Sequence, residues 1–437
     1  MVWTAKLVVA ALRQQRFGFR SAELIQQAQE QRIRATVAYA YAHVPYYRET
    51  MRRLILTPAD FCGARDVARL PLIEREQLQR DPEYFVSDQW PPAACVVFHT
   101  SGTTAAPVTI FRDPPSFFAQ AAHYERLRWI VIRLAGRRRP RDASIRPPEG
   151  STAGTITALH NRMQLPKNLR EKIKTFPFLP PDQLIPELNA WRPDVISAFG
   201  SYLEALFMHV RERRAPFDAP RVVVFGADSL SGAAREWARD ALGIEVLGNY
   251  GATEAPHIGF ECEHHRGYHV NVDFSPVRLL ADDGREAGAG SPGQVVVSNL
   301  VNRATMLLNY RLADVASWVD EPCRCGRNLP LSSYVDTARY AWLDLGEGGS
   351  VHAQVLRLAL GQEPHISRYQ IVQETRRGFV IRLVPSPECD RAGTAERIVS
   401  RCRERLPDDA AVRVEFVADL PRDSSGKVQA VIGLPTR

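Results

Sequence analysis

Apolar and polar positions divide the chain into a helical start, a long alternating middle and a distinct final stretch. Residues 21–43 carry apolar side chains at near-helical spacing behind Ser21, a suitable cap, and a proline soon follows. From about 95 to 335, short apolar runs alternate with glycine-rich turns and helical segments. The stretches 194–200 and 221–225 each contain a mainly apolar run, which favours a sheet buried on both faces. The predicted fold class is α/β.

The last hundred residues follow a different pattern. The predicted elements are a hairpin over 369–374 and 379–384, a helix over 395–405 and a strand over 412–417. These elements make a small α+β unit. We therefore predict two domains, a large one over 1–337 and a small one over 338–437.

Composition and charge narrow the functional class. The 437 residues are 45% hydrophobic and 24% charged, which is typical of a globular protein and argues against disorder. No apolar stretch approaches the ~20 residues of a membrane span, and Leu7–Leu12 is too short for a secretory signal, so we expect a cytoplasmic protein without membrane contact. The net charge of 56 − 49 = +7 permits anionic ligands. No basic face interleaved with aromatic residues supports nucleic-acid binding.

Much of the basic excess lies in one segment, Arg137–Arg141. It is either a solvated, proline-broken loop or a patch that meets phosphate groups.

Four segments carry candidate chemistry. Hydroxyl and backbone N–H groups of Thr100–Pro107 would suit a polyphosphate, although a plain Ser/Thr turn is the alternative. In Asn249–Glu254, glycine permits close approach, Thr253 can donate to a phosphate and Glu254 can hold Mg²⁺; a capped helix start would explain the segment equally well. Asp314 could accept from sugar hydroxyls or form a surface ion pair, and Lys427 follows a flexible turn that would let it reach a cleft.

Together and in this order, the segments resemble the adenylate-forming superfamily of acyl-CoA synthetases, in particular its phenylacetate-CoA ligase-like branch. The matching motifs are Thr100–Pro107, Gly226-Ala227-Asp228, Tyr250–Glu254, Tyr310–Asp314 and Pro421–Lys427, with Val44–Tyr47, Leu70–Leu72 and Cys323–Arg327 indicating the branch. The resemblance covers nearly the whole chain. It implies a large adenylate-forming domain of several subdomains and a small mobile domain that carries the catalytic lysine.

The resemblance also implies roles for single residues. Those assigned to the nucleotide are Ser101, Thr103 and Thr104 for the β- and γ-phosphates, Thr253 for the α-phosphate, Gly226, Ala227, Asp228 and Tyr250 for the adenine, and Asp314 for the ribose. Gly102, Asn249 and Gly251 would also line the nucleotide site. Glu254 would bind Mg²⁺, and Lys427 would bridge the substrate carboxylate and the nucleotide. Arg339 belongs to the hinge motif between the domains.

Two segments depart from the family pattern. Ala105 and Ala106 stand where glycine and lysine are usual in the phosphate loop, which weakens the expected handling of pyrophosphate. Ala341 stands where the hinge has an aspartate, which bears on the domain swing that precedes thioester formation.

The seven cysteines suggest free thiols or a metal site, because an odd number without an export signal does not fit a disulfide framework. Cys262, a histidine, Cys323 and Cys325 would supply the four ligands of a closed structural zinc site. The resemblance favours His269 as the histidine over His264 and His265. Buried free thiols are the alternative.

The leading hypothesis is therefore an ATP-dependent enzyme that adenylates a carboxylic acid, aromatic or otherwise of medium size, and transfers the acyl group to CoA. The expected cofactors are ATP, Mg²⁺, structural Zn²⁺ and CoA, and the resemblance makes a homodimer plausible. An amine or a carrier-protein thiol as acceptor is the runner-up, and a degenerate nucleotide-binding member is the third hypothesis.

Overall fold

The chain folds into two compact units. This computed structural model describes residues 2–99, 108–146, 172–177, 179, 181–281, 283–335, 342–346, 349–352, 356, 360, 363, 365–404, 406–421, 428–429 and 431–434. The large unit comprises Met1–Leu312 and Ala316–Val335, and the small unit comprises Ala313–Val315 and Asp336–Arg437. The predicted boundary between 337 and 338 falls within 336–341, outside the described residues.

The helices and strands of the large unit surround one long sheet. Its helices are α1 (Val2–Phe17), α2 (Ala22–His43), α3 (Pro45–Arg53), α4 (Arg75–Arg80), α5 (Pro114–Ala135), α8 (Pro181–Trp191), α9 (Gly200–Arg213) and α10 (Gly232–Leu242). Its strands are β1 (Val96–His99), β2 (Thr109–Arg112), β3 (Asp142–Ile145), β4 (Ile173–Phe176), β5 (Val195–Phe199), β6 (Val222–Gly226), β7 (Glu245–Tyr250), β8 (Gly259–Glu261), β9 (Tyr268–Val270), β10 (Val277–Leu280), β11 (Pro292–Val297), β12 (Tyr310–Val319) and β13 (Leu331–Ser332).

In the long sheet the strand pairing changes from parallel to antiparallel at β7. Its order is β10-β11-β12-β13-β9-β8-β7-β6-β5-β3-β4. Strands β3 to β7 pair in parallel, whereas β8 pairs antiparallel with β7 and β9 pairs antiparallel with β8. Strand β7 therefore belongs to both halves of the sheet.

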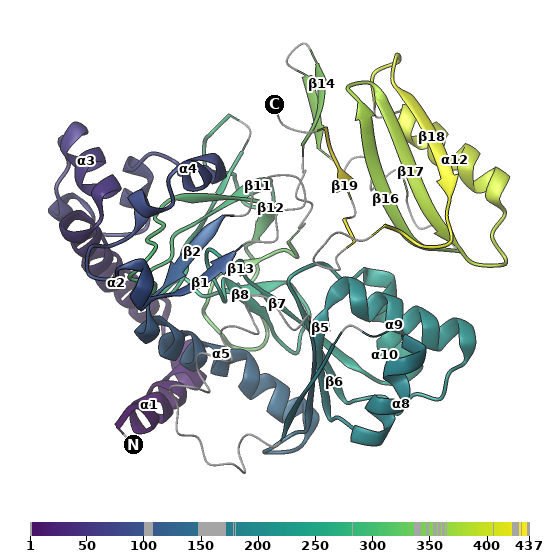
Figure 1. The fold of residues 1–437 in the computed structure, drawn as a ribbon, viewed down its shortest axis with the longest axis horizontal. Helices are drawn as coiled ribbons and strands as arrows, with labels where there is room; N and C mark the ends of the chain where they lie inside the picture. The colour runs from purple at the N-terminus through teal and green to yellow at the C-terminus, as the bar shows by residue number, and fades with distance from the viewer. Residues whose placement is uncertain are drawn as a thin grey trace. The chain divides into compact units, whose positions relative to one another are not determined.

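The parallel half is buried on both faces, as its mainly apolar runs predict. Val222 and Val224 of β6 pack in a core with residues of α5. Val223 and Phe225, which point to the opposite face, pack with residues of α8, α9 and α10. Figure 1 shows these three helices gathered against β5 and β6. The α/β prediction is confirmed.

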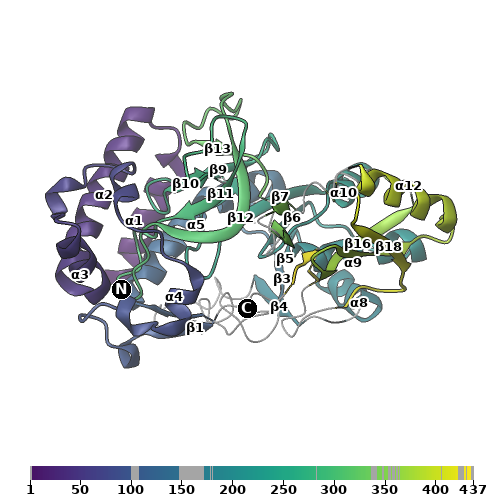
Figure 2. The same ribbon diagram turned by 90° about the horizontal axis from the view of Figure 1, so that it is seen from above.

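The first helices pack on the antiparallel half. Helix α2 begins behind Ser21, whose Oγ accepts a hydrogen bond from the N–H of Leu24 at 3.4 Å, and it ends at His43, as predicted. Pro45 then starts α3, where its fixed φ suits the first helical turn. Ile33 and Val37 of α2 share a core with residues of β10 and β11, and Figure 2 shows α2 on the side of the sheet where these strands lie.

The Arg137–Arg141 segment forms the connection between α5 and β3. Its arginine side chains are exposed. Arg137 Nε lies 3.4 Å from Asp194 Oδ1, and the backbone N–H of Arg141 donates to Asp194 Oδ2 at 2.9 Å. These contacts, with exposed arginine side chains and one of them paired to an aspartate, favour the solvated loop over a phosphate-binding patch.

The small unit matches the predicted α+β pattern. Its elements are β14 (Trp342–Gly346), β15 (Gly349–His352), β16 (Ile366–Thr375), β17 (Gly378–Pro385), α12 (Arg391–Arg403), β18 (Ala411–Phe416) and β19 (Val431–Ile432). Strands β16 and β17 form the predicted hairpin, and β18 and β19 flank it in parallel. Helix α12 begins earlier than predicted because Asp390 caps it, accepting from the N–H of Gly393 at 3.1 Å. None of the described helices in either unit has the length and apolarity needed to cross a membrane.

Candidate functional site

Two predicted nucleotide motifs meet at one edge of the parallel half. Phe199 at the end of β5 pairs with Gly226 at the end of β6, and Gly226 pairs with Asn249 near the end of β7. The carboxyl ends of neighbouring parallel strands lie at one edge, where open α/β sheets bind their ligands. The Gly226-Ala227-Asp228 turn therefore lies beside the segment that leads to Thr253 and Glu254.

The backbone at this edge is tightly constrained. A Cβ on Gly226 would lie 3.0 Å from the carbonyl oxygen of Asn249, and one on Gly200 would lie 2.5 Å from the carbonyl of Ser229. Ala227 has a φ of 67°, a left-handed conformation that costs a non-glycine residue about 1 kcal/mol or more. Strained turns of this kind are frequent at functional sites.

Side chains from two other segments hold the turn that follows β7. Nη2 of Arg112 donates to the carbonyl oxygen of Thr253 at 2.5 Å, and Nδ2 of Asn299 donates to the carbonyl oxygen of Glu254 at 2.9 Å. Residues 253–257 form bends and turns and no helix begins there, so the alternative of a helix capped by Thr253 is wrong. Thr253 is half-buried, and its backbone is fixed from the side of β2.

Glu254 is a buried carboxylate whose two oxygens have different neighbours. It is 6% exposed. Its Oε1 accepts from the Tyr310 hydroxyl at 3.2 Å and lies 3.7 Å from Nη1 of Arg75. Burial, and then the charge of Glu254, raise the pKa of Tyr310, so its hydroxyl keeps the proton that it donates. Among the described residues, the Tyr310 hydroxyl and the Arg75 guanidinium both lie at Oε1 and not at Oε2.

Of the residues predicted to bind the nucleotide, Tyr250 lies on β7 and Asp314 on β12. Tyr250 is buried, with its ring centroid 5.7 Å from that of Tyr268. Asp314 is half-buried on β12, further along the strand that begins with Tyr310.

Several predicted residues lie outside the described part of the chain. They are Ser101, Gly102, Thr103, Thr104, Arg339 and Lys427, together with Ala105, Ala106 and Ala341. The strands that flank the predicted phosphate loop are described: β1 and β2 pair antiparallel, with His99 opposite Thr109. The hairpin therefore brings the two ends of that loop together.

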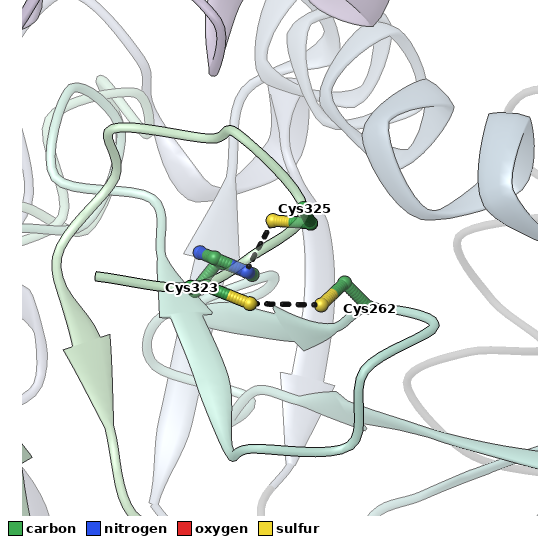
Figure 3. A group of neighbouring side chains, drawn as sticks. Cys262, Cys323 and Cys325 are labelled. Atoms are coloured by element: carbon green, nitrogen blue, oxygen red, sulfur yellow. Dashed lines mark hydrogen bonds between the residues drawn. The ribbon is translucent and has the colours of Figure 1, made fainter. Parts of the chain in front are cut away.

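The four predicted zinc ligands converge in the large unit. The ligand atoms of Cys262, His269, Cys323 and Cys325 all lie within 4.8 Å of one another. The Sγ atoms of Cys262 and Cys323 are 3.6 Å apart, and Cys325 Sγ lies 3.3 Å from His269 Nε2 (Figure 3). Tetrahedral Zn²⁺ with Zn–S bonds near 2.3 Å separates its sulfurs by roughly 3.8 Å. The cluster therefore fits a zinc ion after small adjustments.

The chemistry of the donor set also fits a metal. The Cys262 hydrogen bond lowers the pKa of Cys325, and a bond from His269 acts in the same direction. The same pairing, and then burial, raise the pKa of Cys262. The three cysteine side chains therefore lie close enough to shift one another's pKa values. A bound cation would stabilise all three as thiolates, the form in which cysteine ligates metal. His265 instead contacts Glu261 and Glu245, at 2.9 and 3.1 Å.

The segment that carries Cys323 and Cys325 also anchors the junction of α1 and α2. The backbone N–H of Asn328 donates to the carbonyl oxygen of Gly18 at 2.8 Å. The guanidinium of Arg327 lies over the ring of Phe19, 4.8 Å from its centroid. The metal-site segment and the first helices are thus parts of one packed region.

Three residues at the predicted nucleotide edge have no motif in the sequence: Arg75, Arg112 and Asn299. Tyr310 belongs to the Tyr310–Asp314 motif, but its contact with Glu254 was not predicted. Each reaches the Thr253–Glu254 turn from a segment far away along the chain, so no local spacing could identify it.

Comparisons with known proteins agree on one group. Residues 345–433 match the family described as the CapK C-terminal domain. The phenylacetate-coenzyme A ligase of Escherichia coli is 25% identical over 95% of this chain and 96% of its own length. That of Thermus thermophilus is 27% identical over 70% and 68%. A solved 2-hydroxyisobutyryl-CoA ligase in complex with an acyl-adenylate has a TM-score of 0.74 at 19% identity, covering 96% of this chain and 91% of the other.

Proposed function

Because the chain belongs to the adenylate-forming CoA ligase superfamily, with phenylacetate-CoA ligases as distant homologues, we propose that it activates a carboxylic acid as its acyl-adenylate and transfers the acyl group to coenzyme A. The observation that carries this proposal is the meeting of Gly226–Asp228 with Asn249–Glu254 at one sheet edge. The names of the curated relatives support an aromatic acid and CoA as the acceptor.

The proposed reaction has two displacement steps. In the first, a carboxylate oxygen of the acid attacks the α-phosphorus of ATP, and the bond from that phosphorus to the bridging oxygen breaks, so pyrophosphate leaves. In the second, the CoA thiol loses its proton and its sulfur attacks the acyl carbon, so AMP leaves with the bonding electrons. Both steps bring anions together, and positioning and charge neutralisation are the main catalytic tasks.

The roles follow the motifs of this chain. Hydroxyl and N–H groups of 101–104 would hold the β- and γ-phosphates, and the Thr253 hydroxyl would contact the α-phosphate. Oε2 of Glu254 would hold Mg²⁺, which supplies positive charge to the phosphates when it is bound. Asp314 would accept from the ribose hydroxyls. Lys427 would place its ammonium group between the acid's carboxylate and the α-phosphate.

Acid-dependent exchange of labelled pyrophosphate into ATP tests the first step. We expect exchange with at least one member of a panel of aromatic and aliphatic acids, with its loss in Lys427→Ala and its retention in the control Lys174→Ala. Lys174 lies on β4 and faces Glu187 at 3.7 Å. An absence of exchange with every acid in the wild type would overturn the proposal.

Product analysis with and without CoA tests the second step. We expect the acyl-adenylate alone to accumulate without CoA and acyl-CoA to appear with it. An adenylate that persists in the presence of CoA, and is consumed when an amine or a carrier-protein thiol is added, would move the acceptor to the runner-up class while leaving the adenylation step in place.

We further propose that Cys262, His269, Cys323 and Cys325 bind a structural Zn²⁺. The proximity of three sulfurs and one imidazole nitrogen supports it, since these are the donors of closed zinc sites. Elemental analysis should find about one zinc per chain in the wild type, much less in Cys325→Ser, and an unchanged amount in Cys389→Ser, a thiol of the small unit. Zinc-free wild-type protein with unchanged thermal stability would contradict the assignment.

A further inference from the structure

We propose that Arg112 is a positioning residue of the adenylation site, which fixes the Thr253–Glu254 turn to the base of the β1–β2 hairpin. This assignment rests on the proposed function, because the hairpin flanks the predicted phosphate loop and Glu254 is the predicted magnesium ligand. Arg112 itself contacts protein groups, so its effect on the reaction passes through Thr253 and Glu254.

The guanidinium of Arg112 connects three segments. Its Nη2 donates to the carbonyl oxygen of Thr253 at 2.5 Å, and its Nη1 donates to Oε1 of Gln120 on α5 at 3.5 Å. Its Cζ lies 4.5 Å from the ring centroid of Phe98 on the paired strand β1. One side chain therefore links both strands of the hairpin and α5 to the turn after β7.

The burial of Arg112 argues for a role beyond packing. The residue is 3% exposed, and removing a guanidinium from water is costly enough that an apolar side chain is often the more stable choice in such a place. Burial lowers the pKa of Arg112 to about 10, and the charge of Glu254 opposes this shift. The charge is therefore kept close to the predicted magnesium ligand despite its desolvation.

Arg112 completes a pair of clamps on the turn. Asn299 holds the carbonyl of Glu254 and Arg112 holds that of Thr253, so two consecutive peptide groups have a fixed direction. The direction of these peptides sets where the Thr253 hydroxyl and the Glu254 carboxylate point. Small displacements of such groups reduce catalysis strongly, because the reacting groups must stay in line.

Steady-state pyrophosphate exchange in Arg112 variants tests the assignment. We expect Arg112→Met to lower kcat/KM for ATP about 10- to 100-fold, the factor that a charge-assisted hydrogen bond represents. The Mg²⁺ concentration for half-maximal rate should rise, while KM for the acid changes little. Arg112→Lys, which retains a buried cation and one donor, should recover part of the loss and also shows the effect if Arg112→Met does not fold.

Arg303→Met serves as the control, because Arg303, like Arg112, lies over an aromatic ring, 5.1 Å from the centroid of Tyr39, although it is only half-buried. It should lower the melting temperature without changing the Mg²⁺ requirement. If both Arg112 variants keep the wild-type Mg²⁺ requirement and KM for ATP, the positioning role is overturned and the proposed function stands. A wild type without acid-dependent exchange overturns the proposed function and this assignment together.

Discussion

Protonation of His123 should destabilise the large unit. His123 lies on α5, is 2% exposed, and stacks on Phe274 with ring centroids 3.8 Å apart. Among the described residues neither ring nitrogen has a hydrogen-bond partner. Its Nε2 lies 3.5 Å from Asp273 Oδ2, but Arg126 donates to both oxygens of that carboxylate at 2.9 Å. The Asp273 charge is therefore already compensated, and the neutral imidazole is the stable form.

The sign and size of the effect follow from linkage. Burial, and then the charge of Arg126, hold the pKa of His123 well below 6.5 in the folded protein. Below pH 6.5 the unfolded chain takes up a proton at this residue that the folded chain does not, so stability is present above that pH and is lost as the pH falls. With an unfolded pKa near 6.5, the loss between pH 7.5 and 5.5 is about 1.4 kcal/mol.

Urea denaturation at pH 7.5 and 5.5, followed by tryptophan fluorescence, measures this loss. We expect His123→Phe, which keeps an aromatic ring against Phe274, to lose about 1.4 kcal/mol less than the wild type over this range. Burial also lowers the pKa of His257 to about 4. His257 therefore adds the same loss of stability in both proteins, and this loss cancels when the two are compared. An equal loss in both proteins would show that folding does not shift the pKa of His123, which would refute the reasoning.

Three further outcomes are expected. Glu254→Gln should raise the Mg²⁺ concentration for half-maximal pyrophosphate exchange at least about tenfold, since a neutral amide is a poorer ligand for a hard cation; an unchanged requirement would remove Glu254 from the metal site. Gly200→Ala should lower stability by roughly 1–3 kcal/mol, because its Cβ would lie 2.5 Å from the Ser229 carbonyl, and calorimetry would detect this as a lower Tm. Chelation of zinc should expose the α1–α2 junction to limited proteolysis near Phe19 while the small unit stays resistant; cleavage at the same rate with and without chelator would contradict the anchoring role.

Periodicity and turn chemistry in the sequence were sufficient for the elements that position the site. The apolar runs predicted β5 and β6, and the parallel pairing of these two strands then brings Phe199 beside Gly226. Helix α2 was predictable to its ends because a capping serine and a proline mark them. These features are local, so the sequence displays them directly.

The partners of the Thr253–Glu254 turn were not predictable in the same way. Arg112 and Tyr310 are separated from Glu254 by long stretches of chain, and their contacts exist only after the strands have paired. A single arginine in a short strand looks like any other exposed charge. For the metal site, spacing suggested the cysteines, whereas the convergence of Cys262 with Cys323 depends on strand pairing in the finished sheet.

Strand β7 pairs with β6 on one side and β8 on the other, and this limits where residues can be inserted into the chain or deleted from it. Successive residues of a strand point to opposite faces, so one residue inserted into β7 would turn its side chains over relative to both neighbours at once. Parallel pairing with β6 and antiparallel pairing with β8 would be misaligned together, and Thr253 would move away from Arg112. The exposed connection at 137–141 has no such double constraint. Insertions and deletions during the divergence of this chain are therefore expected in that connection and excluded from β7.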